Sequence, residues 1–282
     1  MSDQAMLDQF MVNWQTHPSA DFSRLYTPAE PSCYEVIRLM GGRPLFLNEH
    51  YDRLTATARS IGQALPFSLS ELEGHITDLA RANGAADYNV KLIYNDFAHG
   101  GTVYLFFTPT AYPTAEMYEK GVATDFLNAI RANPHAKIIN QSLRDDADAL
   151  MAEKGLFEAV LVNEKGEVTE GSKSNLFFIR GDTLVTSPAE AVLLGVTRQR
   201  ILRLAAEHGI PLSQEPIPAD SLGRFSAGFI SGTMILKKIP QTPQPSIQAA
   251  SSSSLGISFM KPVHTRMAMD RENAAYGMIS AQ

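Results

Sequence analysis

The chain has 282 residues, enough for two modest domains or one large one. Hydrophobic residues make up 44% and charged residues 19%, with 19 Gly and 16 Pro, which is typical of a globular protein rather than a disordered, collagen-like or disulfide-stapled one. Thirty acidic against 24 basic side chains give a net charge of -6. Because no run of Lys or Arg offsets this charge, we expect no nucleic-acid partner.

Cysteine content and hydropathy bear on the compartment. Cys33 is the single cysteine, so an internal disulfide is excluded, and we expect its side chain to be a small buried apolar group. No apolar stretch approaches the roughly 18 residues that span a bilayer. The first residues lack the basic and apolar regions of a secretory signal. The sequence therefore predicts a cytoplasmic protein with no membrane association.

Near the start, two stretches of β-forming residues predict a hairpin. Residues 32–40 run into Gly41-Gly42, and the apolar pattern resumes at residues 45–47. Further strands of this region are expected over residues 90–94 and 102–107.

Two helices are expected between these strands. Apolar residues at three- and four-residue spacing predict a helix over residues 49–61. In the second helix, Ser70 and Glu73 resemble a capping box, and Gly84 is a typical stop signal. The region thus predicts a small α+β module over residues 1–113.

After an irregular interdomain connection over residues 114–133, with one strand near residues 122–126, a second module is expected over residues 134–282. Its predicted helices are residues 140–154 and 197–207, and its predicted strands are residues 159–163, 176–179, 184–186 and 229–231. Residues 241–254, rich in Pro, Gln and Ser, resemble a flexible linker, and residues 260–280 are expected to form a weakly amphipathic helix.

Lys137 is the first candidate for chemistry, because its neighbours Ala136, Ile138 and Ile139 are apolar. An apolar setting lowers the pKa of an amine, and a neutral amine is the nucleophile that forms a Schiff base. The alternative is a lysine whose chain packs at a strand edge while its amine reaches water.

Three more positions carry groups that suit a charged ligand. Glu170 follows a strand and turn, and its carboxylate is either simply solvated or acts as a general base, a metal ligand or the partner of a protonated ring nitrogen. Thr197 stands at the expected start of a helix, where it is either a phosphate ligand or an ordinary N-cap residue. Thr233 ends Ser231-Gly232-Thr233, a phosphate-binding turn or an ordinary one. No GxGxxG, P-loop lysine, HExxH or Cys/His cluster is present, so no dinucleotide, nucleotide or metal site is expected.

Taken in order, EHYDRL, the lysine, VTEGSKSNLFFI, LLGVTRQRIL and FISGT form a recognisable series. From about Tyr34 to Thr233 the chain resembles the fold type IV pyridoxal-phosphate enzymes, the class IV aminotransferases. That family includes branched-chain and D-amino-acid aminotransferases and aminodeoxychorismate lyase. The resemblance implies an α+β fold of two domains, a small N-terminal α+β domain and a larger α/β-barrel-like C-terminal domain. It also implies pyridoxal 5'-phosphate (PLP) held between these domains, and a homodimer.

The resemblance implies roles for individual residues. Lys137 would hold PLP as an internal aldimine and move the proton between substrate and cofactor, while Glu170 would keep the pyridine nitrogen protonated. The phosphate would be held by Arg53, Val196, Thr197 and Thr233. Tyr34 and Glu35 would line the substrate pocket, and Asn175 lies in the same block without an assigned role.

The chain departs from the family at three places. Residues 27–32 replace the usual Gly-Asp-Gly turn, and Ser142 stands where branched-chain members carry a tyrosine. The strand over residues 89–94 lacks the Arg-x-His of D-amino-acid members and offers one cation, Lys91, for the substrate carboxylate.

The leading hypothesis is an aminotransferase that moves an amino group from an amino donor to a 2-oxo acid. The first alternative keeps the cofactor and eliminates pyruvate from aminodeoxychorismate. The second alternative is a non-catalytic homologue used for binding.

Overall fold

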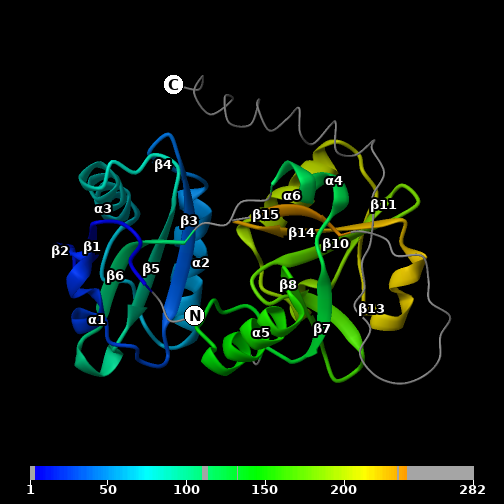
Figure 1. The fold of residues 1–282 in the computed structure, drawn as a ribbon, viewed down its shortest axis with the longest axis horizontal. Coiled ribbons are helices and arrows are strands. Elements are labelled where there is room, and N and C mark those ends of the chain that lie inside the picture. Colours follow the sequence, from blue (N-terminus) through cyan, green and yellow to red (C-terminus); the bar gives the residue numbers. More distant parts are fainter. Residues whose placement is uncertain (1–3, 110–113, 132, 234, 240–282) are drawn as a thin grey trace.

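The computed structural model describes residues 4–109, 114–131, 133–233 and 235–239 (Figure 1). The predicted linker over residues 241–254 and the predicted helix over residues 260–280 lie outside the described residues. Within the described part of the chain, no helix is long and apolar enough to cross a membrane.

The N-terminal half is built on one six-stranded sheet with the order β2-β1-β6-β5-β3-β4 (Figure 1). Every neighbouring pair is antiparallel. Its strands are β1 (Gln9–Val12), β2 (Gln15–Pro18), β3 (Cys33–Met40), β4 (Arg43–Pro44), β5 (Asn89–Asn95) and β6 (Thr102–Thr108). Its helices are α1 (Phe22–Leu25), α2 (Leu47–Ser60) and α3 (Leu69–Ala82), with short 3-10 turns at Ser19–Asp21 and Phe97–His99.

The two faces of this sheet have different neighbours. Ile37 on β3 packs with Leu54 of α2 and Ile76 of α3 in the main core. Successive side chains of a strand point to opposite faces, so Tyr34 lies on the other face and packs with Ile93 and neighbouring aromatic rings. The register pairs Tyr34 with Ile93 and Glu35 with Leu92. Tyr34 and Glu35 are therefore directed to different sides of the sheet.

Most predicted elements of this half are confirmed, with two corrections. The second arm of the first hairpin is β4, not residues 45–47, because Phe46 adopts a left-handed φ of 53° and α2 begins at Leu47. The capping box of α3 is formed by Ser68 and Glu71, two residues earlier than expected, with Ser68 N donating to Glu71 Oε2 at 2.7 Å. Cys33 is fully buried, as expected, and burial raises the pKa of its thiol to about 12.

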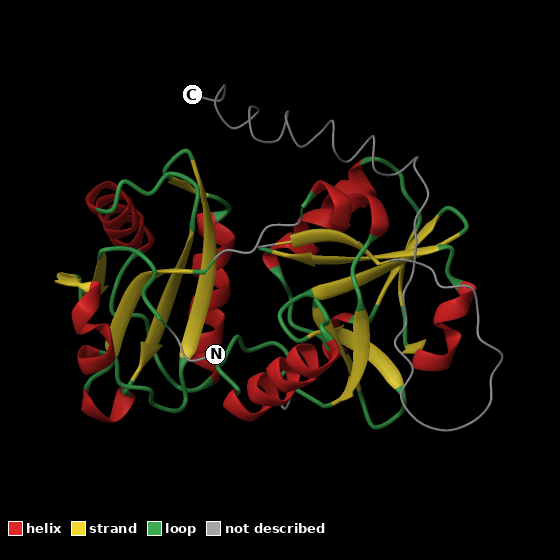
Figure 2. Ribbon diagram, in the orientation of Figure 1, coloured by secondary structure: helices red, strands yellow, loops and turns green. Residues whose placement is uncertain are grey.

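The C-terminal half contains two sheets, with the orders β12-β11-β10-β14-β15 and β13-β9-β8-β7 (Figure 2). Only the β7–β8 and β11–β12 pairs are parallel among the strand pairs of the described residues. The strands are β7 (Thr124–Asn128), β8 (Glu158–Val162), β9 (Glu167–Gly171), β10 (Asn175–Arg180), β11 (Thr183–Thr186), β12 (Leu212–Gln214), β13 (Ile217–Pro218), β14 (Ala227–Gly232) and β15 (Ile235–Ile239). The helices are α4 (Ala115–Lys120), α5 (Gln141–Lys154) and α6 (Val196–Glu207), with 3-10 turns at Ala189–Ala191 and Ala219–Arg224.

Alternation along β10 explains how these layers pack. Leu176 and Phe178 face the core between the two sheets, together with Val160 and Ile230. Phe177 faces the other way, into the cluster under α6. The helices predicted over residues 140–154 and 197–207 and the predicted strands of this half are present, with the first strand two residues later than expected, at Thr124–Asn128.

One short backbone contact joins the two halves and places the candidate site. Cys33 at the start of β3 forms an isolated antiparallel bridge with Ile138. Tyr34 N donates to Lys137 O at 3.1 Å, and Ile139 N donates to Ser32 O at 2.9 Å. The segment that carries Lys137 therefore runs along the end of β3, beside Tyr34.

Candidate active site

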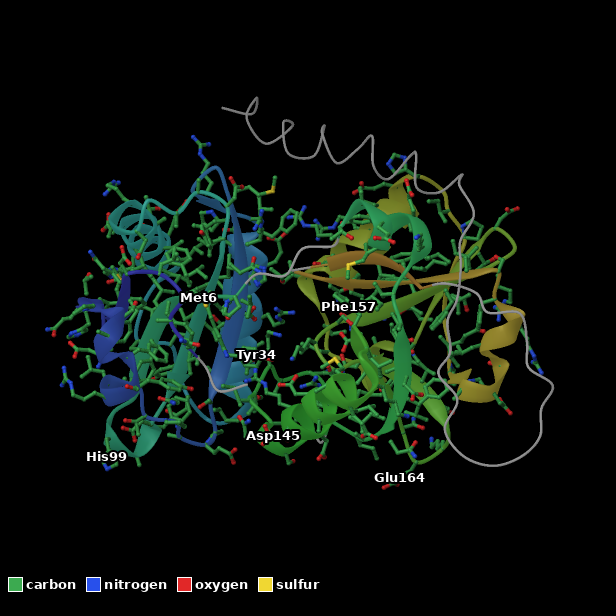
Figure 3. All side chains as sticks on the ribbon, viewed as in Figure 1. Met6, Tyr34, His99, Asp145, Phe157 and Glu164 are labelled. Atoms are coloured by element: carbon green, nitrogen blue, oxygen red, sulfur yellow. The ribbon has the colours of Figure 1, made fainter. Side chains whose placement is uncertain are left out.

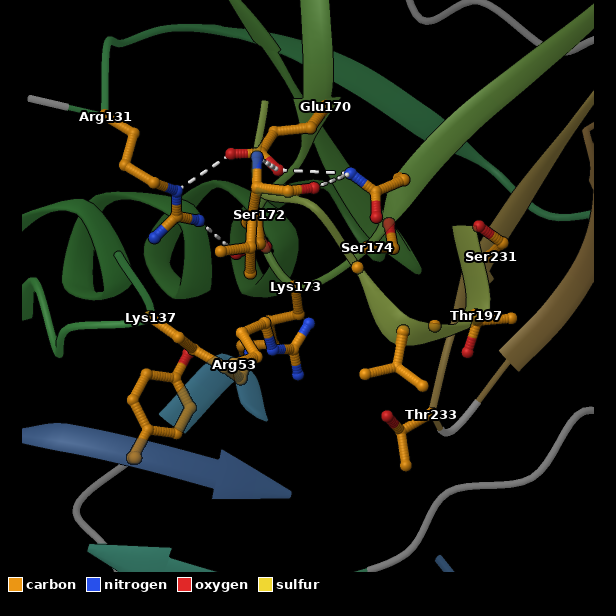
Figure 4. Close-up of a pocket in the computed structure, with 16 residues that line it drawn as sticks. Arg53, Arg131, Lys137, Glu170, Ser172, Lys173, Ser174, Thr197, Ser231 and Thr233 are labelled. Carbon is orange, nitrogen blue, oxygen red and sulfur yellow. Dashed lines mark hydrogen bonds and ion pairs between the residues drawn. The ribbon is translucent and has the colours of Figure 1, made fainter. Parts of the chain in front are cut away.

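A pocket with about 440 Å³ of empty volume, part of it open to solvent, lies where β3 and Lys137 meet the end of β9 and the start of α6. In Figure 4, Glu170 and Arg131 lie at one end of this pocket, and Thr197, Ser231 and Thr233 gather at the other. The predicted site residues that line it are Tyr34, Arg53, Lys137, Glu170, Val196, Thr197 and Thr233. The fold thus brings together residues that are up to about 200 positions apart in the chain.

Lys137 is held in place by its own backbone. Besides the bonds to β3, Lys137 N donates to Thr57 Oγ1 on α2 at 3.1 Å. Burial lowers the pKa of the Lys137 amine, which a Tyr34 phenolate opposes and the positive charge of Arg53 reinforces. Among the residues that the structure describes, no carboxylate forms an ion pair with this amine. The arrangement favours the neutral, nucleophilic form.

Glu170 lies on β9 and is 2% exposed. Its Oε1 accepts from Arg131 Nε at 2.8 Å, and its Oε2 accepts from Leu193 N at 3.0 Å and from Asn175 Nδ2 at 3.4 Å. Burial raises the pKa of this carboxyl, while Arg131 acts in the opposite direction. A carboxylate in this setting is suited to pairing with a protonated nitrogen of a ligand.

Arg131 was not predicted from the sequence. It precedes Lys137 in an irregular segment, where no helical or strand periodicity singles it out. Besides its ion pair with Glu170, its Nη2 lies 3.5 Å from the carbonyl oxygen of Ser172. Arg131 therefore holds Glu170 in position, and it lines the same pocket as Lys137.

The structure gives Asn175 a definite role. Its Nδ2 donates to Leu193 O at 2.9 Å and contacts Glu170. Its Oδ1 lies so close to Gly195 that a Cβ at that glycine would approach it to 2.2 Å. Asn175 thus joins the start of β10 to the loop before α6, and Gly195 is required for this close approach.

A buried glutamate on β8 shapes the turn between Glu170 and Asn175. Glu158 Oε1 accepts from Ser172 N at 3.1 Å and from Ser172 Oγ at 2.6 Å, and Oε2 accepts from Ser174 Oγ at 2.7 Å. A Cβ at Gly171 would come within 2.9 Å of the same carboxylate. The hydrogen bonds of Glu158 to Ser172 and Ser174 therefore fix the conformation of the turn between Glu170 and Asn175.

The opposite end of the pocket is rich in hydroxyl groups and backbone donors. Helix α6 begins here, and no side chain caps its first backbone N–H groups. Thr197 and Thr233 line the same end. Ser231 Oγ is fully buried and has no hydrogen-bond partner in the described part of the chain. Free backbone donors at a helix start and an unpaired buried hydroxyl fit a phosphate group.

Arg53 reaches the pocket from α2, and Glu35 orients it. Arg53 Nε and Nη2 each lie 2.7 Å from a Glu35 carboxylate oxygen, and Nη1 donates to Leu194 O at 3.4 Å. His50 Nδ1 lies 2.8 Å from Glu35 Oε2. Burial alone would raise the pKa of Glu35, but Arg53 and His50 lower it to about 2. The prediction that Glu35 lines the substrate pocket is wrong, because the carboxylate points to α2.

Tyr34 lines the pocket, and Lys91 does not. Tyr34 lies on β3 at the side of the N-terminal half that faces the C-terminal half (Figure 3). The Lys91 ammonium lies 5.3 Å from the Tyr34 ring centroid and is 5% exposed. A direct contact between Lys91 and a substrate stays a prediction. Within the described residues, no group of three or more His, Cys, Asp or Glu side chains is arranged to hold a metal ion.

Comparison with known proteins agrees with this geometry. Residues 32–237 match the family described as "Amino-transferase class IV", and the chain belongs to that family. A putative branched-chain-amino-acid aminotransferase of Methanocaldococcus jannaschii is 28% identical over 214 residues, which cover 71% of this chain and 74% of that protein. A D-alanine aminotransferase of Listeria monocytogenes is 30% identical over 217 residues, with 72% and 74% covered.

Solved structures share the fold. The branched-chain amino acid aminotransferase of Escherichia coli superposes with a TM-score of 0.76 at 22% identity and covers 93% of both chains. A putative 4-amino-4-deoxychorismate lyase of Legionella pneumophila gives a TM-score of 0.72 at 18% identity, covering 89% of this chain and 97% of that one. The branched-chain enzyme of Thermobaculum terrenum, solved in its PLP form, gives 0.70 at 19% identity, covering 84% and 86%. The predicted α+β class and the predicted family are confirmed.

Proposed function

We propose that this class IV aminotransferase uses PLP to move an amino group from an amino acid to a 2-oxo acid. One observation carries the proposal: a lysine amine with a lowered pKa and a buried carboxylate line the same pocket, opposite a cradle of hydroxyls and helix N–H groups. Each of these groups matches one part of the cofactor, its aldehyde, its ring nitrogen and its phosphate.

The chain's own residues divide the work. Lys137 Nζ would hold the cofactor covalently, Glu170 would pair with its ring nitrogen, and Thr197 and Thr233 would donate to its phosphate. When bound, PLP supplies an electron-withdrawing ring that accepts the electron pair left on the substrate when a proton departs. The Arg131 guanidinium opposes the rise in the pKa of Glu170 that burial causes, so it favours the carboxylate form that would pair with a protonated ring nitrogen.

Lys137 also carries the proton. Because burial lowers its pKa, the Lys137 amine favours the neutral form, and its Nζ would accept a proton from the substrate carbon as a general base. The backbone bonds to β3 and Thr57 restrict where Nζ reaches, which keeps it on one face of the pocket. The same amine would return this proton at the cofactor carbon C4′.

Arg53 should matter more for phosphate binding than either threonine. We expect Arg53→Ala to raise the Kd for PLP by roughly 10- to 100-fold, because charge-assisted hydrogen bonds contribute about 1.5–3 kcal/mol. Thr197→Val and Thr233→Val each remove an uncharged donor and no net charge, which predicts a smaller increase, of about 2- to 10-fold. Fluorescence titration with PLP measures all three. If Arg53→Ala binds PLP as tightly as the parent protein, Arg53 is not a phosphate ligand.

The proposed function has a direct spectroscopic test. The purified protein is loaded with PLP, and L- and D-amino acids are added singly while the visible absorbance is followed. We expect either the L- or the D-amino acids to bleach the visible absorbance band of the bound cofactor, and a 2-oxo acid to restore this band. Pyruvate release from aminodeoxychorismate, with no restoration by 2-oxo acids, identifies a lyase instead. A protein that forms no cofactor band is a non-catalytic homologue.

We further propose that residues 1–113 and 134–282 are the two domains, joined by residues 114–133. The sheet of the N-terminal half ends at Thr108 and the sheets of the C-terminal half begin at Thr124, which supports this division. A homodimer and a cytoplasmic location stay predictions, and size-exclusion chromatography tests the first.

A further inference from the structure

Helix α6 carries a buried arginine in its first turn. Arg198 directly follows Thr197, is 1% exposed and does not line the pocket. Side chains of a helix lean toward its N-terminus. The Arg198 side chain therefore extends back beneath the turn in which Val196 and Thr197 line the pocket.

Two hydrogen bonds fix the Arg198 guanidinium under this turn. Its Nη2 donates to Ser187 O at 3.0 Å and to Gln214 Oε1 at 2.8 Å. Ser187 Oγ in turn donates at 2.8 Å to the carbonyl oxygen of Val168, on the strand β9 that also carries Glu170. The start of α6 is thus tied to the end of β12 and, through Ser187, to β9.

The positive charge of Arg198 is buried without a counter-charge. In the part of the chain that the structure describes, its Nε has no hydrogen-bond partner and no carboxylate forms an ion pair with its guanidinium. Burial lowers the pKa of Arg198 and the Glu170 carboxylate raises it, but an arginine stays protonated in a protein. A buried cation without a carboxylate partner is unfavourable, and so is a cation at the positive end of a helix dipole. An anion bound at the start of α6 would offset both costs.

The phosphate of the proposed cofactor is an anion of this kind. A phosphate monoester carries about 1.5 to 2 negative charges at neutral pH. The charged cations that line the pocket already have carboxylate partners: Arg53 pairs with Glu35, Arg131 with Glu170 and Lys173 with Asp148. Arg53 can donate hydrogen bonds to a phosphate, but Glu35 balances its charge.

We propose that the buried charge of Arg198 stabilises the cofactor phosphate at the start of α6 without touching it. The inference rests on the proposed function, because it concerns the phosphate of the same cofactor. Arg198 acts across the first turn of the helix, in a buried setting that screens its charge less than water does. Its charge adds to that of the free N–H groups at the helix start.

The proposal has a consequence for the protonation of the phosphate. A nearby positive charge favours the dianion over the monoanion, so it lowers the second pKa of a bound phosphate below its usual value of about 6. Loss of the charge should raise this pKa again. A purely structural role of Arg198 predicts instead that a lysine, which keeps the charge and loses the planar fork, behaves as badly as an uncharged residue.

A substitution beside Arg198 tests its charge without removing it. Gln214→Glu replaces the amide that accepts from Arg198 Nη2 by a carboxylate of nearly the same shape, at an exposed position of β12. Because this carboxylate balances the charge of Arg198, we expect the Kd for PLP to rise by roughly 5- to 50-fold in a fluorescence titration. The Kd for pyridoxal, which has the same aldehyde and ring but no phosphate, should change by less than about twofold.

Variants of Arg198 itself separate its charge from its hydrogen bonds. We expect Arg198→Met to raise the Kd for PLP by roughly 10- to 100-fold relative to pyridoxal, and Arg198→Lys to stay within about threefold of the parent. Arg203→Met is the matched control, because Arg203 is exposed on the same helix and its replacement removes the same charge.

Phosphorus-31 NMR of the PLP-loaded proteins gives a second readout. The titration midpoint of the bound phosphate should rise by about one pH unit in Gln214→Glu and Arg198→Met, but not in Arg198→Lys. If neither the midpoint nor the PLP-to-pyridoxal ratio changes, or if both ligands weaken equally, Arg198 only holds the start of α6 and the proposal is wrong. A protein that forms no cofactor band, yet binds inorganic phosphate in calorimetry and loses this binding in Arg198→Met, would refute the proposed function and support the role of Arg198.

Discussion

Lys137→Ala is expected to lose aminotransferase activity by a factor on the order of 10³ or more. The substitution removes the covalent attachment of the cofactor and the group that carries the proton, and positioned general bases alone contribute about 10²- to 10⁴-fold. The protein should still fold, because Lys137 is tethered through its backbone to Tyr34 and Thr57 and forms no ion pair with the described residues.

Borohydride reduction of the PLP-loaded protein, followed by peptide mapping, checks the assignment. We expect the pyridoxyl group on Lys137 in the parent and no labelled lysine in Lys137→Ala. Lys120→Ala is the control, since Lys120 lies on the exposed surface of α4 and pairs with Glu116. Label on Lys173, the other lysine that lines the pocket, would contradict the assignment.

Glu35→Gln is expected to destabilise the apoprotein by about 3–5 kcal/mol. Glu35 is 1% exposed and holds Arg53 at two nitrogens, so its replacement leaves a buried guanidinium without a counter-charge. Urea unfolding measures the change. Glu164→Gln is the control, because Glu164 lies in an exposed turn (Figure 3) and surface changes stay within about 0.5 kcal/mol.

The ion pair between Glu35 and Arg53 predicts that the protein loses stability at acid pH. Burial raises the pKa of Glu35, but Arg53 and His50 lower it from 4.5 to about 2 in the folded protein. Glu35 therefore contributes stability that is fully present above pH 4.5 and is lost as the pH falls toward 2. In Glu35→Gln this part of the acid dependence should disappear. If the free energy of unfolding falls equally in the parent and in Glu35→Gln between pH 4.5 and pH 2, the ion pair does not form.

The residues that the sequence predicted best are those inside continuous motifs. Lys137, Glu170, Thr197 and Thr233 stand in short patterns whose neighbours also identify them, and all four line the pocket. Arg131 lies in an irregular stretch, and nothing local shows that it pairs with Glu170, 39 positions further along the chain. Such partners are set by the packing of distant elements.

Two other differences have local causes. Tyr34 and Glu35 are adjacent in a strand, so period-two alternation already places them on opposite faces, and assigning both to one pocket was inconsistent with that geometry. The hairpin of β1 and β2 was not predicted. Its turn uses Asn13 and Trp14 with left-handed φ values of 45° and 68°. Trp at such a position is an unusual turn residue, so the sequence signal for this hairpin is weak.

Because the Lys137 segment is hydrogen-bonded to β3, the geometry of the site depends on how the two halves of the chain are positioned against each other. The Lys137 segment is hydrogen-bonded to β3 of the N-terminal sheet, whereas Glu170 belongs to β9 in the C-terminal half. A small rotation of one half against the other therefore changes the separation of amine and carboxylate without altering either residue. The bonds from Arg53 to Leu194 and from Arg200 to Glu49 resist that rotation. Substitution of Glu49 or Arg200, which do not line the pocket, should therefore change the alignment of the reacting groups from a distance.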